Sequence, residues 1–326
     1  MIVVMIILFS SVSDSFLTLR NFISIYREGA TVGFLSVGMA YLIGCGEVDL
    51  SCGTIVALMV IVTGRIVEGT RLPLPFVLLL AVLISVCLEL LNYVIIHTFH
   101  ISAFITTLAM STVYKGLRFY IAFKENGLAT SKTLTNKEIT VLGGKTGYIY
   151  YSIIALLIVI VIAQVLLKLT KYGNDIYALG SNKKAAVLAG VNEVKVKFIA
   201  FGIMGVMCGL SSIFMLGRLG AATVNVSDGM EFLAVSSVVI GGASIWVYGA
   251  TGGVSDAVGG FVGMTFMFIL KNGLMKINVD SSYISMLQGL ALLVIMSSDL
   301  ILEKISNTRK RAKMEMLADV GGVKNE

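Results

Sequence analysis

The sequence predicts an all-α protein: a polytopic integral membrane bundle of about ten transmembrane helices with short or re-entrant segments. Three observations lead to this fold class. Of the 326 residues 57% are apolar, only 13% are Asp, Glu, Lys or Arg, and the mean hydropathy is +0.92. Soluble proteins carry about 25% charged residues, so this composition excludes an ordinary soluble enzyme. Because one crossing takes about 20 apolar residues, the chain has room for about ten crossings and no large soluble domain.

Ten apolar runs bounded by charged or turn residues are the candidate spans. The fourth, sixth and tenth are long and nearly unbroken, whereas the third, eighth and ninth are short and glycine-rich, as is typical of tight or re-entrant segments. The first has no basic amino end and predicts an anchoring helix rather than a cleaved signal. The runs cover residues 1–18, 30–46, 51–67, 74–96, 101–123, 148–168, 198–217, 231–248, 254–270 and 283–302.

The basic residues predict which loops face the cytoplasm. Six lysines lie between Lys168 and Lys197, and a second basic stretch covers residues 303–326. Basic loops remain cytoplasmic, and four predicted spans separate the two stretches, so both face the same side and both termini are expected there. The segment from Lys124 to Lys145 holds four lysines and would lie outside, which argues weakly against this topology.

Glycine spacing predicts close helix packing, because pairs of small residues four apart let two backbones approach in lipid. Three such pairs are Gly29 with Gly33, Gly205 with Gly209, and Gly259 with Gly263.

Charged residues inside predicted spans are costly and need compensation. Glu89, Lys115 and Arg118 are the cases here. They predict either an ion pair between helices or side chains that reach the membrane interface.

Patterns for nucleotide, metal and catalytic sites are incomplete. Lys145 and Thr146 resemble the end of a phosphate-binding loop, but Ile139 occupies the position of its first glycine. His97 and His100 are the only histidines and predict a water-facing helix end rather than a metal site. The four cysteines show no paired spacing. We therefore expect no catalytic residue, no metal and no cofactor bound by this chain.

Residues 181–191, which read SNKKAAVLAGV, predict a short helix outside the membrane. Ser181 or Asn182 can cap its start, and Gly190 can end it. A short helix with small side chains is suited to a groove on another protein, although a surface helix without a partner explains the pattern equally well.

Several segments in order resemble one family. Residues 46–53 read GEVDLSCG, residues 104–108 FITTL, residues 239–244 VIGGAS and residues 270–274 LKNGL. Together with residues 181–191 they resemble inner-membrane permeases of ABC importers for ribose and related simple sugars, a family that also includes autoinducer and nucleoside permeases. The resemblance covers about residues 21–299.

Two departures from the family pattern stand out. Glu47 replaces a glycine or another small neutral residue. The segment from Ile245 to Ala250 is longer and more aromatic than the usual glycine turn.

The resemblance implies a single permease domain over residues 1–326, with a cytoplasmic coupling segment at 169–197 and a cytoplasmic tail at 303–326. It implies a transport subunit in the bacterial inner membrane that imports a small polar solute, most simply ribose or a related sugar, by alternating access. ATP and Mg would bind to separate ATPase subunits. The other implied partners are a second permease subunit, identical or paralogous, and an extracytoplasmic substrate-binding protein; no nucleic acid is expected.

The resemblance also implies roles for particular residues. ATPase coupling is expected at Ala185, Ala186, Leu188 and Gly190. The family signature loop comprises Gly46, Asp49, Leu50, Ser51 and Gly53, and the glycine turn comprises Gly241, Gly242 and Ser244. Candidates for the translocation path are Phe104, Thr106, Thr107, Asn225 and Asn272, which would otherwise be ordinary interhelical hydrogen-bonding residues.

Alternative functions remain open from sequence. A permease for branched-chain amino acids or nucleosides belongs to the same superfamily. An ion-coupled secondary carrier would place a titratable residue at the midplane and show an internal repeat, and neither is clear in this sequence.

Overall fold

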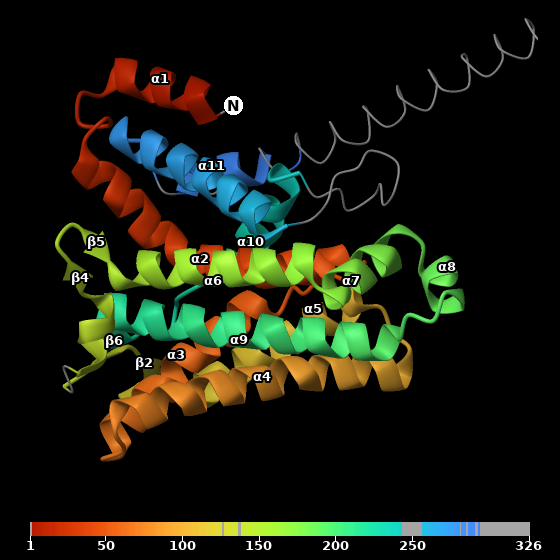
Figure 1. Ribbon diagram of the computed structural model, residues 1–326. Helices are drawn as coiled ribbons and strands as arrows, with labels where there is room; N and C mark the ends of the chain where they lie inside the picture. Colours follow the sequence, from red (N-terminus) through yellow and green to blue (C-terminus); the bar gives the residue numbers. More distant parts are fainter. Residues whose placement is uncertain are drawn as a thin grey trace, which may run out of the picture.

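The computed structural model is an all-helical bundle with short strands at one end (Figure 1). It describes residues 2–125, 127–135, 138–242, 256–280, 282–284, 286–290 and 293. The helices are α1 (Ile2–Val12), α2 (Leu19–Gly44), α3 (Cys52–Gly69), α4 (Leu74–Phe99), α5 (Ala103–Ile121), α6 (Tyr151–Leu169), α7 (Lys171–Ser181), α8 (Lys183–Leu188), α9 (Glu193–Leu219), α10 (Met230–Ile240) and α11 (Ala257–Lys276), with a 3₁₀ helix, η1 (Glu138–Gly143).

Five helices in the described part of the chain are long and apolar enough to cross a membrane, namely α3, α4, α6, α9 and α11. Two further apolar helices, α1 and α10, have 11 residues each. The sequence predicted about ten spans. Of those predicted runs, 1–18, 231–248, 254–270 and 283–302 extend in part beyond the described residues. The tail 303–326, Ser244 and the segment 245–250 lie wholly outside them.

The start of α2 differs from the sequence expectation. The first two apolar runs predicted one helix over 1–18 and another from residue 30. The structure instead ends α1 at Val12 and begins α2 at Leu19, where the hydroxyl of Thr18 accepts a hydrogen bond from the Asn21 amide. The first turns of α2 contain charged residues, so a search for apolar runs began the helix too late.

The long helix α9 lies at the centre of the bundle and packs against α4, α2 and α3 (Figure 1). Gly205 and Gly209 form its contact with α4: a methyl group on Gly205 would lie 2.5 Å from the Val86 Cα. The Ser85 hydroxyl donates to the Gly205 carbonyl at 2.8 Å across the same contact. The predicted close approach at this glycine pair is confirmed.

The pair α10 and α11 also packs backbone against backbone. A methyl group on Gly263 would overlap the Ser237 carbonyl, and one on Gly241 would overlap the Gly259 carbonyl. Neither glycine can be enlarged unless the two helices separate.

Short antiparallel strand pairs gather at one end of the bundle, opposite α8 (Figure 1). The pairs are β1 (Phe123–Glu125) with β2 (Leu128–Thr130), β3 (Lys132–Thr133) with β6 (Ala221–Ala222), and β4 (Lys145–Thr146) with β5 (Ile149–Tyr150). From the sequence, the stretch from Lys124 to Lys145 was expected only to lie outside the membrane, and no strands were predicted there. We call this end the strand end and the other the α8 end.

Candidate functional site

Two helices begin inside the bundle rather than at its ends. The Cys208 thiol of α9 lies 3.8 Å from the Cys52 carbonyl at the start of α3. Cys208 is near the middle of α9, so α3 begins halfway along the bundle. The start of α10 meets the start of α3 there, because the Ser227 hydroxyl donates to the Gly53 carbonyl at 2.7 Å. Gly53 permits this contact, since a methyl group would overlap Glu231 Oε2.

The chain reaches this depth from the α8 end through a sharp turn after α2. Gly46 has φ +82°, and the amides of Gly46 and Glu47 donate to the carbonyls of Ile43 and Leu42 at 3.0 and 2.8 Å. This pattern is a Schellman helix end, which favours glycine at the left-handed position. Gly46 in the family signature loop therefore has a local structural role.

The segment between Glu47 and Cys52 leads from the α8 end to the middle of the bundle. Contacts with α9 give its depth, because Lys197 contacts Glu47 at one end and Cys208 contacts the Cys52 carbonyl at the other. On α9, the eleven residues from Lys197, which contacts Glu47, to Cys208 rise about 16 Å at 1.5 Å per residue. The two segments therefore span the same depth side by side.

Buried polar side chains from three segments meet where α3 begins, and we call them the polar junction: Asp49, Ser51, Glu89, Asn92 and Tyr114. Asp49 Oδ1 accepts hydrogen bonds from the amide and the hydroxyl of Ser51, each at 2.7 Å. Asn92 Nδ2 donates to Ser51 Oγ at 2.8 Å and to Glu89 Oε2 at 3.2 Å. The Tyr114 hydroxyl donates to Asn92 Oδ1 at 2.8 Å. All five side chains are buried.

Asn92 connects the polar junction, because its amide contacts the loop before α3, its own helix α4, and α5. Thr107 of α5 adds a second link, since its hydroxyl accepts the Leu50 amide at 3.0 Å. Buried polar groups cost free energy unless they are paired, so this network fixes the loop in one arrangement relative to α4 and α5.

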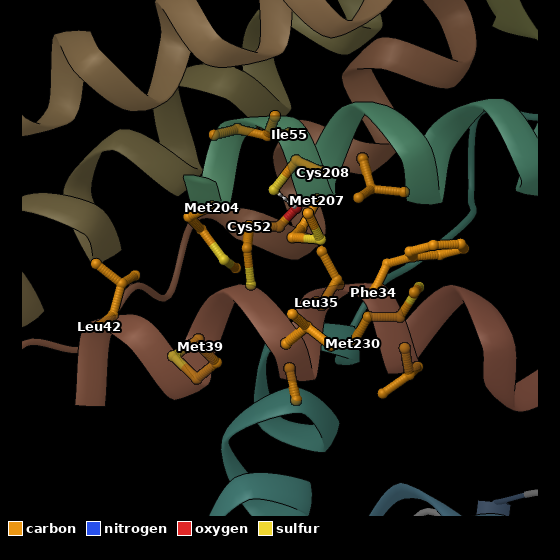
Figure 2. Packing of buried hydrophobic residues seen from close by; sticks show 14 of the residues in the cluster. Phe34, Leu35, Met39, Leu42, Cys52, Ile55, Met204, Met207, Cys208 and Met230 are labelled. Atoms are coloured by element: carbon orange, nitrogen blue, oxygen red, sulfur yellow. Dashed lines mark hydrogen bonds between the residues drawn. The ribbon is translucent and has the colours of Figure 1, made fainter. Parts of the chain in front are cut away.

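A methionine-rich apolar cluster adjoins the polar junction (Figure 2). Figure 2 shows the Cys208 thiol directed at the Cys52 carbonyl, with Met204 and Met207 of α9 beside them and Met39 and Met230 nearby. Methionine side chains are unbranched and fill irregular gaps in several conformations. The contact between α2, α9 and α10 can therefore repack more readily than one built from β-branched residues.

Arg118 forms a second anchor for the segment before α10. Its side chain is fully buried, and Nη1 donates to Asp228 Oδ1 at 3.2 Å and to the Val226 carbonyl at 3.4 Å. Among the charged residues within predicted spans, Arg118 forms an ion pair with Asp228, whereas Lys115 is exposed. Glu89 belongs to the polar junction.

A chain of ion pairs links α8 to the loop before α3. Lys183, the first residue of α8, lies 2.7 Å from Glu193 Oε1 at the start of α9. Lys197 lies 2.8 Å from the same oxygen and 2.5 Å from Glu47 Oε1. The side chains of Lys197 and Glu47 are only 14% and 15% exposed, so their pair is largely shielded from water. We call these four residues the ion-pair chain.

The short helix predicted from residues 181–191 is present as α8. Asn182 caps it by accepting the Ala185 amide at 3.0 Å, and Gly190 ends it with φ +91°. Leu188 is 89% exposed, whereas Ala186 is buried against the rest of the chain. Of the residues expected to touch an ATPase, Ala185, Leu188 and Gly190 are exposed and Ala186 is turned inward.

The residues predicted for a translocation path do not share one set of contacts. Thr107 binds the loop before α3, whereas Asn272 of α11 accepts a hydrogen bond from Asn21 at 2.8 Å. Thr106 is buried, and Phe104 and Asn225 are exposed. In the glycine turn, Gly241 caps α10 and Gly242 has φ +109°.

Sequence reasoning missed Asn92, Tyr114 and the ion-pair chain as functional groups. Asn92 could have been found from the sequence, because Glu89 and Asn92 are two polar residues three positions apart in an otherwise apolar run. Lys197 offered no such signal, because it lies within a stretch that is basic throughout.

The known proteins that this chain resembles are permease components of transport systems. A family model described as the permease component of a branched-chain amino acid transport system matches residues 21–296. The ribose import permease protein of Bacillus subtilis is 30% identical, over 91% of this chain and 89% of its own length. An L-arabinose ABC transporter permease protein of Azospirillum brasilense is 30% identical over 91% and 86%, and a D-allose transport system permease protein of Escherichia coli is 27% identical over 92% and 90%. No solved structure gives a significant match.

Proposed function

This chain belongs to the family of permease components whose model it matches, and from that premise we propose that it forms one half of the membrane path of an ATP-driven sugar importer. It is a transport subunit and not an enzyme, and it is a multi-pass protein of the bacterial inner membrane. The cargo is inferred from the relatives, which are named for ribose, L-arabinose and D-allose. Branched-chain amino acids, named in the family description, are the alternative cargo.

The α8 end faces the cytoplasm in this proposal. Its support is the basic stretch from Lys168 to Lys197, together with the tail at 303–326. About ten crossings then bring both termini to that side: the five long apolar helices, the helices α1, α2, α5 and α10, and the predicted run 283–302.

The partners follow from the family. Two ATPase subunits, which bind ATP and Mg, contact the cytoplasmic face. A second permease, either a copy of this chain or a paralogue, completes the path. An extracytoplasmic binding protein delivers the sugar at the strand end.

Helix α8 is the coupling element, and its exposure is the observation that carries this proposal. A leucine that is 89% exposed on a short capped helix outside the apolar spans is suited to a groove on a partner. Ala185, Leu188 and Gly190 form the contact, and Ala186 holds the helix against the permease.

Motion of α8 reaches the middle of the membrane through the ion-pair chain. Lys183 moves with α8, and Glu193 and Lys197 connect it to Glu47. Two residues further, Asp49 contributes to the polar junction at the start of α3. Displacement of α8 therefore acts on the segment that fixes α3 against α4 and α5.

The cycle alternates between two arrangements of the bundle. ATP and the loaded binding protein shift the balance between them only by binding one arrangement more tightly. The methionine-rich contact beside the starts of α3 and α10 is the part that repacks.

Co-purification tests the coupling role. The chain is expressed with the ATPase subunit of its proposed importer and purified in mild detergent, either unchanged, as Leu188→Arg, or as the control Val141→Arg. Val141 is 61% exposed at the strand end. We expect the ATPase to co-purify with the unchanged chain and the control but not with Leu188→Arg. Failure of the ATPase to accompany any of the three would overturn the proposal.

Uptake tests the cargo. A strain lacking this chain is given labelled ribose, L-arabinose, D-allose and leucine, with and without the restored chain. Sugar uptake that depends on the chain is expected, whereas leucine uptake alone would favour the alternative cargo. Proteoliposomes holding only this chain should not concentrate solute on a proton or sodium gradient; if they do, the chain is a secondary carrier.

A further inference from the structure

A basic cavity opens at the strand end, away from the polar junction and from α8. It has a volume of about 570 Å³ and lies between the first turns of α2 and the β4–β5 hairpin. Its walls carry three cationic side chains, Arg20, Arg27 and Lys145, and two aromatic rings, Tyr148 and Tyr150. Aliphatic side chains of α2 complete one wall, so the cavity combines a charged side with an apolar side.

The positive charge of this cavity is not compensated within the described part of the chain. No carboxylate lines the cavity. The nearest acid along α2, Glu28, is paired with Lys271 at 2.5 Å. The guanidinium of Arg27 lies 4.1 Å from the centre of the Tyr150 ring, and its buried Nε has no hydrogen-bond partner there. Three cations that share one cavity without an acid attract an anionic group.

The depth of the cavity in the membrane is set by α6. Tyr150 directly precedes this helix, which has 19 residues and is long and apolar enough to cross a membrane. The cavity therefore lies at the outer limit of an apolar span, where the headgroups of lipids are found. Tyrosine is enriched at this level because its ring is apolar and its hydroxyl is polar.

An exposed apolar face of α6 leads away from the cavity toward the α8 end. Ile154, Leu157, Ile158 and Val161 are each more than a third exposed. Figure 1 shows β5 joined to the strand end of α6, so this exposed face begins within about one turn of the hairpin that lines the cavity. Acyl chains fit such a face, which a soluble ligand would leave uncovered.

We propose that this cavity binds the headgroup phosphate of an anionic phospholipid. Arg20, Arg27 and Lys145 bind the phosphodiester oxygens, for which arginine offers paired donors. The aliphatic wall contacts the glycerol region, and the acyl chains lie along α6. A zwitterionic lipid carries the same phosphate with a compensating cation, so the three basic residues discriminate in favour of net negative charge.

Lipid retention tests the site on the purified full chain. The chain is reconstituted with equal amounts of phosphatidylglycerol and phosphatidylcholine and examined by native mass spectrometry. We expect phosphatidylglycerol to be retained preferentially, and about tenfold less of it on the variant Arg20→Gln/Arg27→Gln/Lys145→Gln. The matched control, Lys171→Gln/Lys184→Gln/Lys195→Gln, removes the same charge from exposed residues at the α8 end and should retain the lipid.

Several results would overturn the proposal. Equal retention of the two lipids, or equal loss in both triple variants, would show that no specific site exists. If inorganic phosphate raises the thermal midpoint as much as phosphatidylglycerol does, the site serves a free anion. If a polyglutamate peptide binds and the lipid does not, the surface serves an acidic protein. If the triple variant is unstable, the single variant Lys145→Gln in the hairpin provides the test. We expect it to retain less phosphatidylglycerol than the unchanged chain, and equal retention would overturn the proposal.

Discussion

Glu47 and Lys197 lie 150 residues apart in the sequence and form an ion pair with a separation of 2.5 Å. This pair joins the loop before α3 to the start of α9, and Lys197 continues through Glu193 to Lys183 on α8. Glu47 is thus the inner end of the ion-pair chain.

Neutralising Glu47 should uncouple ATP hydrolysis from transport. In Glu47→Gln the assembled transporter should keep its ATPase activity but import about tenfold fewer solute molecules per ATP, equivalent to about 1.4 kcal/mol of lost coupling. Uptake and phosphate release in the same proteoliposomes measure the ratio. Glu68→Gln, which removes an acid paired with Lys132 at the strand end, is the control and should keep the ratio. An unchanged ratio in Glu47→Gln would show that the ion-pair chain transmits nothing.

Gly53→Ala should destabilise the fold, whereas Gly69→Ala in the same helix should not. The added methyl at Gly53 overlaps Glu231 Oε2 and lies 3.1 Å from the Ser227 carbonyl, but nothing lies within 4 Å of that at Gly69. Overpacking of this kind costs about 1–3 kcal/mol. Thermal unfolding in detergent gives the comparison. Equal midpoints for the two variants would mean that α3 and α10 do not meet at Gly53.

Removing the Tyr114 hydroxyl should lower the free energy of unfolding by about 1 kcal/mol, the usual net contribution of one hydrogen bond. Tyr114→Phe keeps the ring and deletes the donor to Asn92. Tyr120→Phe on the same helix is the control, because that side chain is 76% exposed. Denaturation of both variants by a graded series of detergent mixtures provides the measurement, and an effect of the same size at Tyr120 would count against the polar junction.

Cys45 should react slowly with maleimide in the folded chain. The side chain is only 4% exposed, and its thiol donates to the Leu42 carbonyl at 3.2 Å. Since the thiolate is the nucleophile, labelling should accelerate as the pH rises, but the buried position of the thiol should keep it slow. Peptide mapping by mass spectrometry should find Cys45 unlabelled at pH 7.5.

The same thiol reports on the ion-pair chain. Glu47→Gln frees the turn beside Cys45 and removes an adjacent negative charge, so labelling at pH 7.5 should increase at least severalfold. Glu68→Gln should leave it unchanged. Rapid labelling of the unaltered chain would contradict the buried position of Cys45.

Local features of the structure were predictable because their signals are local. The helix within residues 181–191 was expected from its cap and its glycine, and the structure places Asn182 and Gly190 in those two roles. The close approach at Gly205 and Gly209 followed from their spacing alone.

Features that depend on distant segments were not predictable. The polar junction combines a loop, α4 and α5, and nothing near Asn92 in the sequence indicates Ser51 or Tyr114 as its partners. The sequence also did not indicate the depth at which α3 begins, because a buried segment between two helices has the composition of an ordinary loop. Charged residues in the first turns of α2 misled a search for apolar runs.

The glycine contacts distinguish helix pairs that are held rigidly together from contacts that can repack. With backbone pressed on backbone, α4 and α9 cannot slide past each other without a steric collision, and the same holds for α10 and α11. Each pair is expected to move as one rigid unit, and the methionine-rich contact of α9 with α2, which in turn packs against α10, is where the units can shift against each other. Force applied at the start of α9 would therefore displace α4 together with α9 relative to α2 and α10, while the glycine contacts within each pair stay intact.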